Sequence, residues 1–207
     1  MDKKNFVSDR KYLVKLKDYF TRPYSLDNGT AQGSALSPLL FLIMINDFPK
    51  LSRFTSEALF ADDCTIWRSG NNILQIMKHL QDDLKLIETW CKEWGFVINT
   101  SKTIGIVFSN KGITINPTLK INDRIIEFKS SCKILGVAFD SRLSWMHHIQ
   151  DVRERISPRL NLMRSLTGVN WGASKSTLLI IYKAWIRSIL DYNCWVYRDA
   201  AKSNLRI

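Results

Sequence analysis

The sequence lacks a long apolar run, a secretory leader and any excess of charged or disorder-promoting residues. Its longest apolar run, residues 39–45, is far shorter than the roughly 20 residues that a membrane-spanning helix needs. Residues 1–5 are polar and charged, with no apolar stretch behind them, so they do not form a secretory signal. A hydrophobic content of 45% against 24% charged residues predicts a folded core rather than disorder. We therefore expect an intracellular protein with no membrane partner.

Cysteine and histidine are few and poorly placed for metal binding. The histidine pair His147-His148 has no cysteine or acidic cluster nearby in the sequence, which argues against a zinc site there. No two cysteines have the spacing of a metal site. Four reduced thiols are expected instead, as in most intracellular proteins: Cys64, Cys91, Cys132 and Cys194.

The whole chain has a net charge of +11, and acidic residues become scarce in its second half. Residues 1–100 hold 13 Lys and Arg against 12 Asp and Glu, whereas residues 101–207 hold 17 against 7. This asymmetry favours a polyanionic partner for the basic half, such as nucleic acid. The alternative is a basic surface that is merely solvated.

Apolar periodicity predicts an α+β chain without internal repeats. A long helix is expected to start at a cap, Asn71 or Asn72, to run to Trp94 and to end at Gly95. Asn122-Asp123 is expected to form a hairpin turn. Further helices are expected at 11–20, 34–47, 146–166 and 174–197, loops at 21–33 and 168–172, and strands at 57–60, 64–67, 104–108, 119–121, 125–128 and 133–138.

Two adjacent acids, Asp62 and Asp63, lie between the first two of these strands, at the predicted hairpin tip. Carboxylates on a rigid hairpin are the ligands with which phosphoryl-transfer enzymes of the two-metal type hold Mg²⁺. Taken alone, an Asp pair at a turn is more often a solvated loop, because Asp favours turns. Flanking apolar residues predict a hairpin that packs in a core while its tip does not: Leu59, Phe60, Ile66 and Trp67.

Five segments, in the same order, resemble the reverse transcriptases of non-LTR retrotransposons, especially the jockey-like group. Residues 29–47 resemble the family's block B and residues 59–63, Leu-Phe-Ala-Asp-Asp, resemble block C. Residues 90–109 resemble block D, residues 135–145 the primer-gripping turn and the start of the thumb, and residues 182–194 the last thumb helix. The resemblance covers roughly residues 11–200.

The resemblance implies a partial polymerase palm, made of antiparallel strands with packed helices, over residues 1–140. An α-helical thumb would follow at residues 141–207, so that the natural boundary lies near residue 140. It also implies partners: an RNA template, a DNA primer and deoxynucleoside triphosphates, with Mg²⁺ or Mn²⁺ as cofactor. A retroelement enzyme of this kind would be expected in the nucleus, although no basic import signal is evident.

Roles follow from the matched positions. Asp62 is the expected metal ligand with Asp63 beside it, and Lys102 is expected near the triphosphate, where a cation can neutralise the leaving pyrophosphate. Gln32, Gly33 and Ala61 are expected against the incoming nucleotide and template base. The alternatives are a surface lysine at position 102 and, for Gln32-Gly33, a plain loop before a helix.

The remaining roles concern the primer and the duplex. Leu135-Gly136 is expected to shape the turn that holds the primer end, and it can also belong to a core strand. A row of basic residues in the thumb would follow nucleic-acid phosphates without reading sequence, unless it is only a solvated face: Arg153, Arg155, Arg159, Arg164, Lys175, Lys183 and Arg187.

One family feature has no match. Polymerases of this kind need a further metal-binding aspartate in block A, and none of the residues before Gln32 fits that block. Fingers, endonuclease and RNase H segments have no match either. Mg²⁺ demands near-ideal octahedral geometry, so one carboxylate pair without its partner aspartate would hold the ion weakly. We therefore expect a partial reverse transcriptase that does not polymerise alone. The alternatives are a non-enzymatic nucleic-acid-binding remnant and, less well matched, an intron maturase or viral RNA polymerase.

Overall fold

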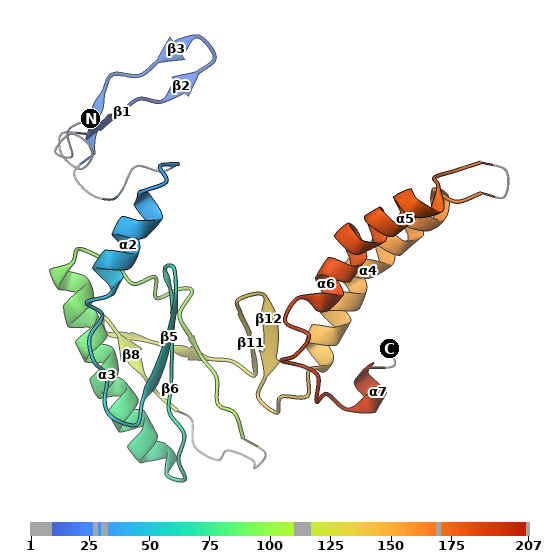
Figure 1. Ribbon diagram of the computed structural model, residues 1–207. Helices are drawn as coiled ribbons and strands as arrows, with labels where there is room; N and C mark the ends of the chain where they lie inside the picture. The colour runs from blue at the N-terminus through green and yellow to red at the C-terminus, as the bar shows by residue number, and fades with distance from the viewer. Residues whose placement is uncertain (1–9, 27–28, 30–32, 110–116, 169–170, 206–207) are drawn as a thin grey trace. The chain divides into compact units, whose positions relative to one another are not determined.

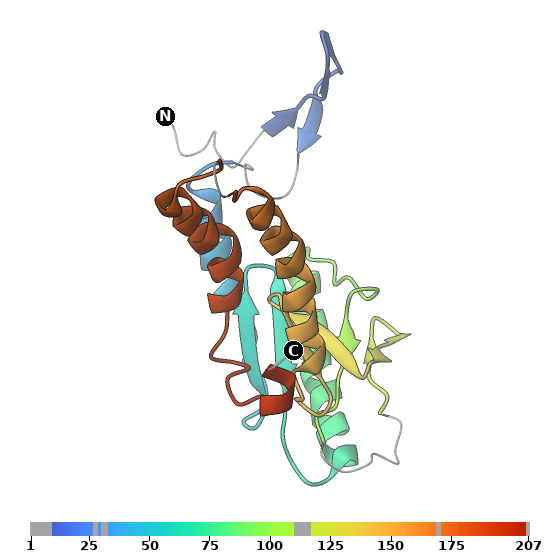
Figure 2. The ribbon, with the colours of Figure 1, turned by 90° about the vertical axis from the view of Figure 1, so that its right-hand side faces the viewer.

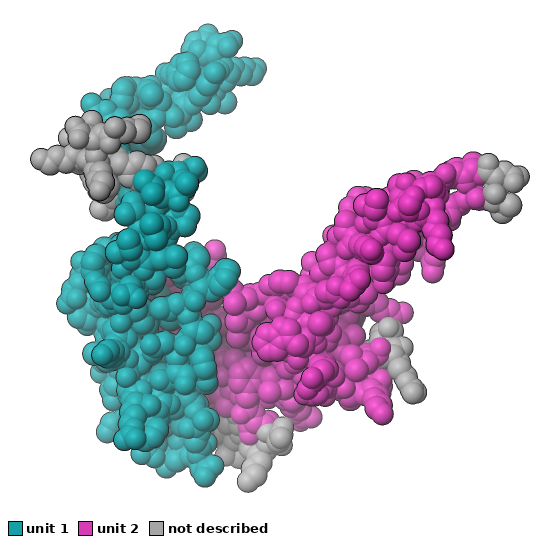
Figure 3. Space-filling model, in the orientation of Figure 1, with its two compact units in different colours: residues 1–98 teal, residues 99–207 magenta. Residues whose placement is uncertain are grey.

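A computed structural model of the chain describes residues 10–26, 29, 33–109, 117–168 and 171–205, coloured along the chain in Figures 1 and 2. The chain divides into two compact units, residues 1–98 and 99–207 (Figure 3). Both combine helices with sheets of two strands, which confirms the α+β composition. The boundary predicted near residue 140 lies inside the second unit and stays a prediction. Within the described residues, no helix has the length and apolar character of a membrane span.

The first unit begins with a β-hairpin where a helix was predicted. Strand β1 (Arg10–Tyr12) pairs with β4 (Tyr24–Leu26), and β2 (Lys15–Leu16) pairs with β3 (Tyr19–Phe20), all antiparallel. The helix predicted at 11–20 is therefore wrong, and so is the predicted loop over β4. Aromatic residues favour strands, and Tyr12 stacks on Tyr24 directly across the ladder with ring centroids 5.4 Å apart.

The rest of the first unit agrees with the predicted elements. Helix α2 (Ser37–Ile45) carries its proline in the first turn, and a hairpin of β5 (Ser56–Phe60) and β6 (Asp63–Trp67) follows. Helix α3 (Ile73–Glu93) begins at Asn72, whose side-chain oxygen accepts the N–H groups of Leu74 and Gln75. Gly95, at φ 72°, ends it as predicted.

Helix α3 supplies the core of the first unit. Its residues Ile87, Trp90 and Cys91 are buried. The side chains packed on them come from α2, the segment that follows α2, strand β6 and the segment that follows α3. Figures 1 and 2 show α3 lying along one face of the β5–β6 hairpin. The packed residues are Ile45, Phe48, Leu51, Ile66, Phe96 and Ile98. Because an isolated two-stranded hairpin is marginally stable in water, this contact with α3 is needed to hold β5–β6.

Short strand pairs open the second unit. The predicted turn at Asn122-Asp123 is confirmed, because both residues have positive φ (46° and 61°) and join two paired strands. The single strand predicted at 133–138 is wrong: Leu135 and Gly136, at φ 46° and 83°, form a second turn of this kind. The strands are β7 (Ile104–Gly105), parallel to β10 (Glu127–Phe128), and the hairpins β8 (Lys120–Ile121) with β9 (Arg124–Ile125) and β11 (Ser131–Ile134) with β12 (Val137–Asp140).

A helical hairpin completes the second unit. Helix α4 (Met146–Ser165) packs against a continuous second arm, made of α5 (Lys175–Tyr182), the π-helical turn η1 (Lys183–Arg187) and α6 (Ser188–Asp191). The second arm ends at Asp191 rather than at the predicted residue 197, because Tyr192 takes an extended backbone with ψ 114°. A short helix that was not predicted, α7 (Lys202–Leu205), follows. The core of the helical hairpin consists of Val152, Ile156, Ile186 and Ile189.

Candidate active site on the β5–β6 hairpin

The two predicted metal ligands lie at the turn of the β5–β6 hairpin. Phe60 pairs with Asp63, which leaves Ala61 and Asp62 as a two-residue turn with Ala61 at φ 50°. Asp62 therefore lies at the tip, whereas Asp63 is the first residue of β6. Both acids are exposed. In the part of the chain that the structure describes, no group of three or more His, Cys, Asp or Glu gathers as a metal site would require, at this turn or anywhere else.

The strand register decides which way Asp63 faces. Directly paired residues share a face of the sheet, so Asp63 shares a face with Phe60, and Cys64 shares the opposite face with Leu59. Ile66, on the same face as Cys64, packs on the α3 core. Asp63 therefore faces away from α3.

The same alternation corrects the prediction that all four flanking apolar residues pack in a core. Only Ile66 contacts the buried cluster. Phe60 and Trp67 belong to the face opposite α3 and are 64% and 50% exposed, and Leu59 is 37% exposed. The hairpin thus has one packed face and one apolar open face, and the open face carries Asp63.

Two cysteines lie near the packed face: Cys64 of β6, whose residue is partly open to solvent, and Cys91 of α3, which is buried. Burial, with smaller contributions from Cys91 and Glu57, raises the pKa of Cys64 to about 11, so this thiol stays protonated at neutral pH. Burial likewise raises the pKa of Cys91. All four cysteines are free thiols, as predicted. Protonated thiols are poor nucleophiles and metal ligands, which leaves the carboxylates as the reactive groups of the hairpin.

A buried carboxylate that the sequence reading missed fixes the base of the hairpin. Asp83 of α3 is 1% exposed and accepts hydrogen bonds from the Ser52 N–H (2.8 Å), the Ser52 hydroxyl (2.8 Å) and the Thr55 hydroxyl (2.5 Å). Arg68, directly after β6, donates to both hydroxyls, at 3.1 and 3.3 Å. The segment before β5 and the residue after β6 are therefore tied to one helix position.

A signal for this network was present in the sequence. Asp83 falls three residues after Leu80 and four before Ile87, on the apolar stripe of α3. An acid in such a stripe is costly to bury unless several donors meet it. Burial alone would raise the pKa of Asp83, but the bonds from Thr55 and Ser52 and the charge of Arg68 outweigh burial and lower it.

The residues predicted against the nucleotide are only partly described. Gln32 lies outside the described residues. Gly33, just before α2, has φ 86°, and a side chain added there would meet nothing within 4 Å. The open surroundings and positive φ suit close approach of a ligand to the backbone. The role of Gly33 stays a prediction, as does that of Ala61.

Lys102, in the second unit, sits on a compact turn. The Asn99 side-chain oxygen accepts the N–H groups of Ser101 and Lys102 (3.2 and 3.3 Å), and the Arg124 guanidinium donates to the Thr100 hydroxyl (3.3 Å). The Lys102 residue is exposed, and its ammonium group has no bond within the described residues. The turn thus fixes the backbone at Lys102 while leaving its charge in solvent.

The Leu135-Gly136 turn is held from the C-terminal side of the helical hairpin. The Tyr192 hydroxyl donates to the Leu135 carbonyl at 2.8 Å, and a Cβ on Gly136 would lie 3.4 Å from the Tyr192 ring. The next strand, β12, is braced by α4, because the Ala138 N–H donates to Nδ1 of buried His148 (3.3 Å). The predicted turn is present, and its contact with a primer stays a prediction.

The seven predicted phosphate-binding residues divide into two groups. Arg159 donates to the Trp185 carbonyl (2.9 Å), Arg164 to Asn161 (3.2 Å) and Arg187 to the Asp191 carboxylate (3.0 Å). These three side chains have structural partners. The side chains of the other four form no hydrogen bond or ion pair within the described residues: Arg153, Arg155, Lys175 and Lys183.

Comparison with known proteins identifies the family to which this chain belongs. The family profile described as reverse transcriptase (RNA-dependent DNA polymerase) matches residues 3–139. The chain is 27% identical to a probable RNA-directed DNA polymerase from transposon BS of Drosophila melanogaster, over 97% of this chain and 23% of that protein. It is also 27% identical to the RNA-directed DNA polymerase from the mobile element jockey of the same species, over 98% of this chain and 23% of that protein.

The chain thus spans about a quarter of the length of the curated relatives that it matches. No solved structure matches it. The family profile covers the candidate hairpin, Lys102 and the Leu135-Gly136 turn. The resemblance to retrotransposon enzymes is confirmed, and the chain belongs to the reverse transcriptase (RNA-dependent DNA polymerase) family.

Proposed function

We propose that this chain forms part of the palm and the thumb of a polymerase that copies RNA into DNA, with its catalytic acids on the β5–β6 hairpin. The observation that carries the proposal is the placement of Asp62 in a two-residue turn, with Asp63 exposed on the face opposite α3. A rigid hairpin with one packed face can present both carboxylates to a substrate without moving.

The donor set fits Mg²⁺. Asp62 and Asp63 offer hard oxygen ligands, and neither carboxylate has a hydrogen bond or ion pair within the described residues. When bound there, Mg²⁺ would supply the positive charge that stabilises the attacking and leaving oxygens of nucleotidyl transfer. Mn²⁺ has the same preference for oxygen ligands. Lys102 would hold its ammonium group near the triphosphate and neutralise charge on the departing pyrophosphate.

The second unit supports the proposal through its basic helical hairpin. Arg153, Arg155, Lys175 and Lys183 have no internal partner in the described residues, so their charge is available to nucleic-acid phosphates. The turn at Leu135-Gly136, fixed by Tyr192, offers backbone groups at a defined position for a primer end. The partners would be an RNA template, a DNA primer and deoxynucleoside triphosphates.

We expect the 207-residue chain alone to be inactive as a polymerase. Two carboxylates leave most of an octahedral Mg²⁺ shell without protein ligands, and losing one ligand removes several kcal/mol of transition-state stabilisation. A primer-extension assay on an RNA template with Mg²⁺ or Mn²⁺ tests this. Templated extension that Asp62→Asn abolishes would contradict the expectation and show that the two acids suffice.

A non-enzymatic nucleic-acid-binding role is the second candidate, favoured by the same four basic residues. A measurement of metal binding distinguishes this role from the polymerase role. If the chain is a polymerase segment, Mn²⁺ should broaden the amide resonances around Asp62 and Asp63 in wild type but not in Asp62→Asn. If only binding remains, a fluorescently labelled RNA–DNA duplex should bind both proteins equally, and Mn²⁺ should not broaden the hairpin resonances of either.

A further inference from the structure

The N-terminal β-hairpin of the first unit has a surface that the proposed catalytic roles do not use. Every residue from 11 to 26 is exposed, although the segment is rich in rings. Exposed apolar surface of this extent on an ordered element marks a binding surface. The exposed fractions of the four rings are 46% for Tyr12, 82% for Tyr19, 63% for Phe20 and 39% for Tyr24.

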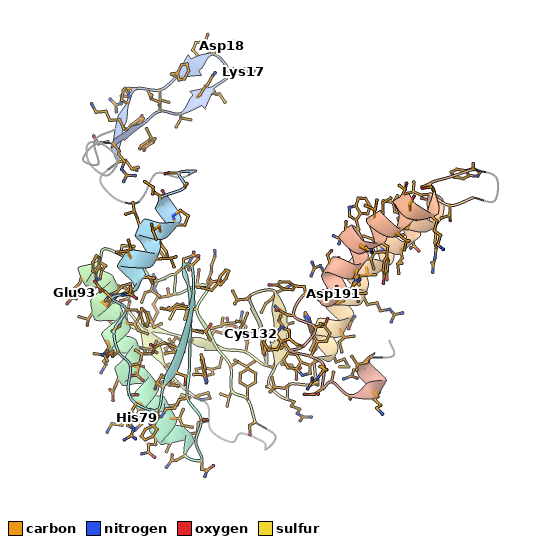
Figure 4. The ribbon with its side chains drawn as sticks, viewed as in Figure 1. Lys17, Asp18, His79, Glu93, Cys132 and Asp191 are labelled. Atoms are coloured by element: carbon orange, nitrogen blue, oxygen red, sulfur yellow. The ribbon has the colours of Figure 1, made fainter. Side chains whose placement is uncertain are left out.

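The hairpin is also strongly basic. Residues 10–26 include a single acid, Asp18, against five Lys and Arg, so the segment has a net charge of +4. Figure 4 labels Lys17 and Asp18 at the turn that joins β2 to β3, where Lys17 has φ 55°. The other cations are distributed along the two arms of the hairpin, on β1, on β2 and between β3 and β4: Arg10, Lys11, Lys15 and Arg22.

Cations and rings are interleaved rather than separated. The Lys15 ammonium lies 5.4 Å from the centre of the Phe20 ring, directly across the ladder, and the Arg22 guanidinium lies 5.5 Å from the Tyr24 ring. Leu16 pairs with Tyr19 on the opposite face of the ladder, where both side chains are open to solvent. Two of the four exposed rings, Phe20 and Tyr24, therefore have a positive charge beside them.

This combination suits one class of ligand. Single-stranded nucleic acid binds where aromatic rings stack on bases and nearby cations meet the backbone phosphates. The core of a protein–protein interface is depleted of lysine, whereas this segment of 17 residues has three. The charge complementarity therefore favours a polyanion that also presents flat rings.

We propose that the β1–β4 hairpin is a single-strand-binding element that stacks unpaired bases of the nucleic-acid substrate on its exposed rings, Phe20 on one face of the strand pair and Tyr19 on the other, while Lys15, Lys17 and Arg22 contact its phosphates. The proposal rests on the proposed function, because it assumes that the chain handles nucleic acid, and it gives the first unit a nucleic-acid contact surface of its own. Duplex has its bases already stacked, so the element should discriminate in favour of single strands.

The test measures fluorescence anisotropy of a labelled, unstructured 12-nucleotide RNA and of an RNA–DNA duplex over a range of salt concentrations. The variant Tyr19→Leu/Phe20→Leu keeps apolar area but removes the ring faces. We expect its affinity for the single strand to fall at least about fivefold, with an unchanged salt slope and little change for the duplex. The variant Lys15→Gln/Lys17→Gln/Arg22→Gln should lower the single-strand salt slope by about 2.

Matched controls lie on the solvent side of α3. Lys78→Gln/Lys85→Gln/Lys92→Gln removes three exposed charges from the same unit and should leave single-strand binding almost unchanged. Circular dichroism and urea unfolding confirm that each variant is folded. All substitutions fall on exposed residues and spare the Tyr12–Tyr24 stack, so folding should be retained.

Two results would overturn the inference and leave the proposed function intact. In one, both hairpin variants bind the single strand like wild type, while Arg153→Gln/Arg155→Gln/Lys183→Gln weakens duplex binding. In the other, wild type self-associates in light scattering and the hairpin variants do not, which would make the hairpin a protein contact. If wild type binds neither RNA nor duplex, the proposed function itself fails.

Discussion

Replacing Asp83 by asparagine should destabilise the first unit more than any other single exchange of an acid for its amide in the described part of that unit. Asp83 accepts three hydrogen bonds at 2.5–2.8 Å and is 1% exposed. A hydrogen bond to a charged group contributes about 1.5–3 kcal/mol, and contributions within one network are not additive. Asparagine keeps one acceptor oxygen but turns an amide N–H₂ toward the hydroxyls of Ser52 and Thr55. The free energy of unfolding is expected to fall by about 2–4 kcal/mol.

The sign of the pH dependence gives a second readout. The folded-state pKa of Asp83 is lowered, because the bonds from Thr55 and Ser52 and the charge of Arg68 outweigh the effect of burial. The stabilisation from this carboxylate is therefore complete above its unfolded pKa of about 3.9 and is lost as pH falls through the lower folded value. The difference in unfolding free energy between wild type and Asp83→Asn should thus shrink below about pH 4.

Urea unfolding followed by tryptophan fluorescence measures both effects. With a slope of about 2 kcal/mol per molar urea, the expected loss moves the midpoint by about 1–2 M. Asp82→Asn is the matched control, since Asp82 is the preceding residue on α3 and is exposed, and it should shift stability by less than about 0.5 kcal/mol. Equal midpoints for the Asp83 and Asp82 variants would refute the reasoning that the network holds the base of the hairpin.

Two further predictions concern the second unit. Gly136→Ala should cost about 1–2 kcal/mol in urea unfolding, because alanine is strained at φ 83° and its Cβ would lie 3.4 Å from the Tyr192 ring; unchanged stability would show that the turn relaxes freely. The pKa of buried His148 is lowered by desolvation, so only the unfolded state gains a proton as pH falls below about 6.5, and stability should decline there. Unfolding at pH 7 and pH 5 measures this decline, which His147→Gln should retain and His148→Gln should lose.

The sequence predicted those elements whose signals are local. Helix α3 has a long apolar period, an Asn72 cap and a terminating glycine, and all three are present in the structure. The helix prediction for residues 11–20 was wrong, because Tyr12, Leu16 and Phe20 recur every four residues and this spacing suggests a helix. Cross-strand pairing with residues that had been read as a loop decided otherwise. Periodicity in so short a window cannot detect a partner strand.

In the candidate site, too, residues with local signals were predicted and residues that depend on distant partners were not. Asp62 and Asp63 were found from their neighbours along the chain, and the structure places them at the hairpin turn as predicted. Asp83 was missed because its partners Ser52 and Thr55 are 31 and 28 residues away. The split of residues 133–138 into two strands was missed because Leu135, an unusual residue for positive φ, takes that conformation in the turn that Tyr192 contacts.

The register of the β5–β6 hairpin also limits how this segment can change over generations. Successive side chains alternate between the α3 face and the open face, so losing or gaining one residue within β5 or β6 would exchange the two faces beyond that point. Ile66 would turn to solvent, or Asp63 would turn toward the apolar cluster of Trp90 and Cys91. Surface loops tolerate insertions and deletions. In this hairpin, single-residue length changes should be rare, and paired changes should be the tolerated kind.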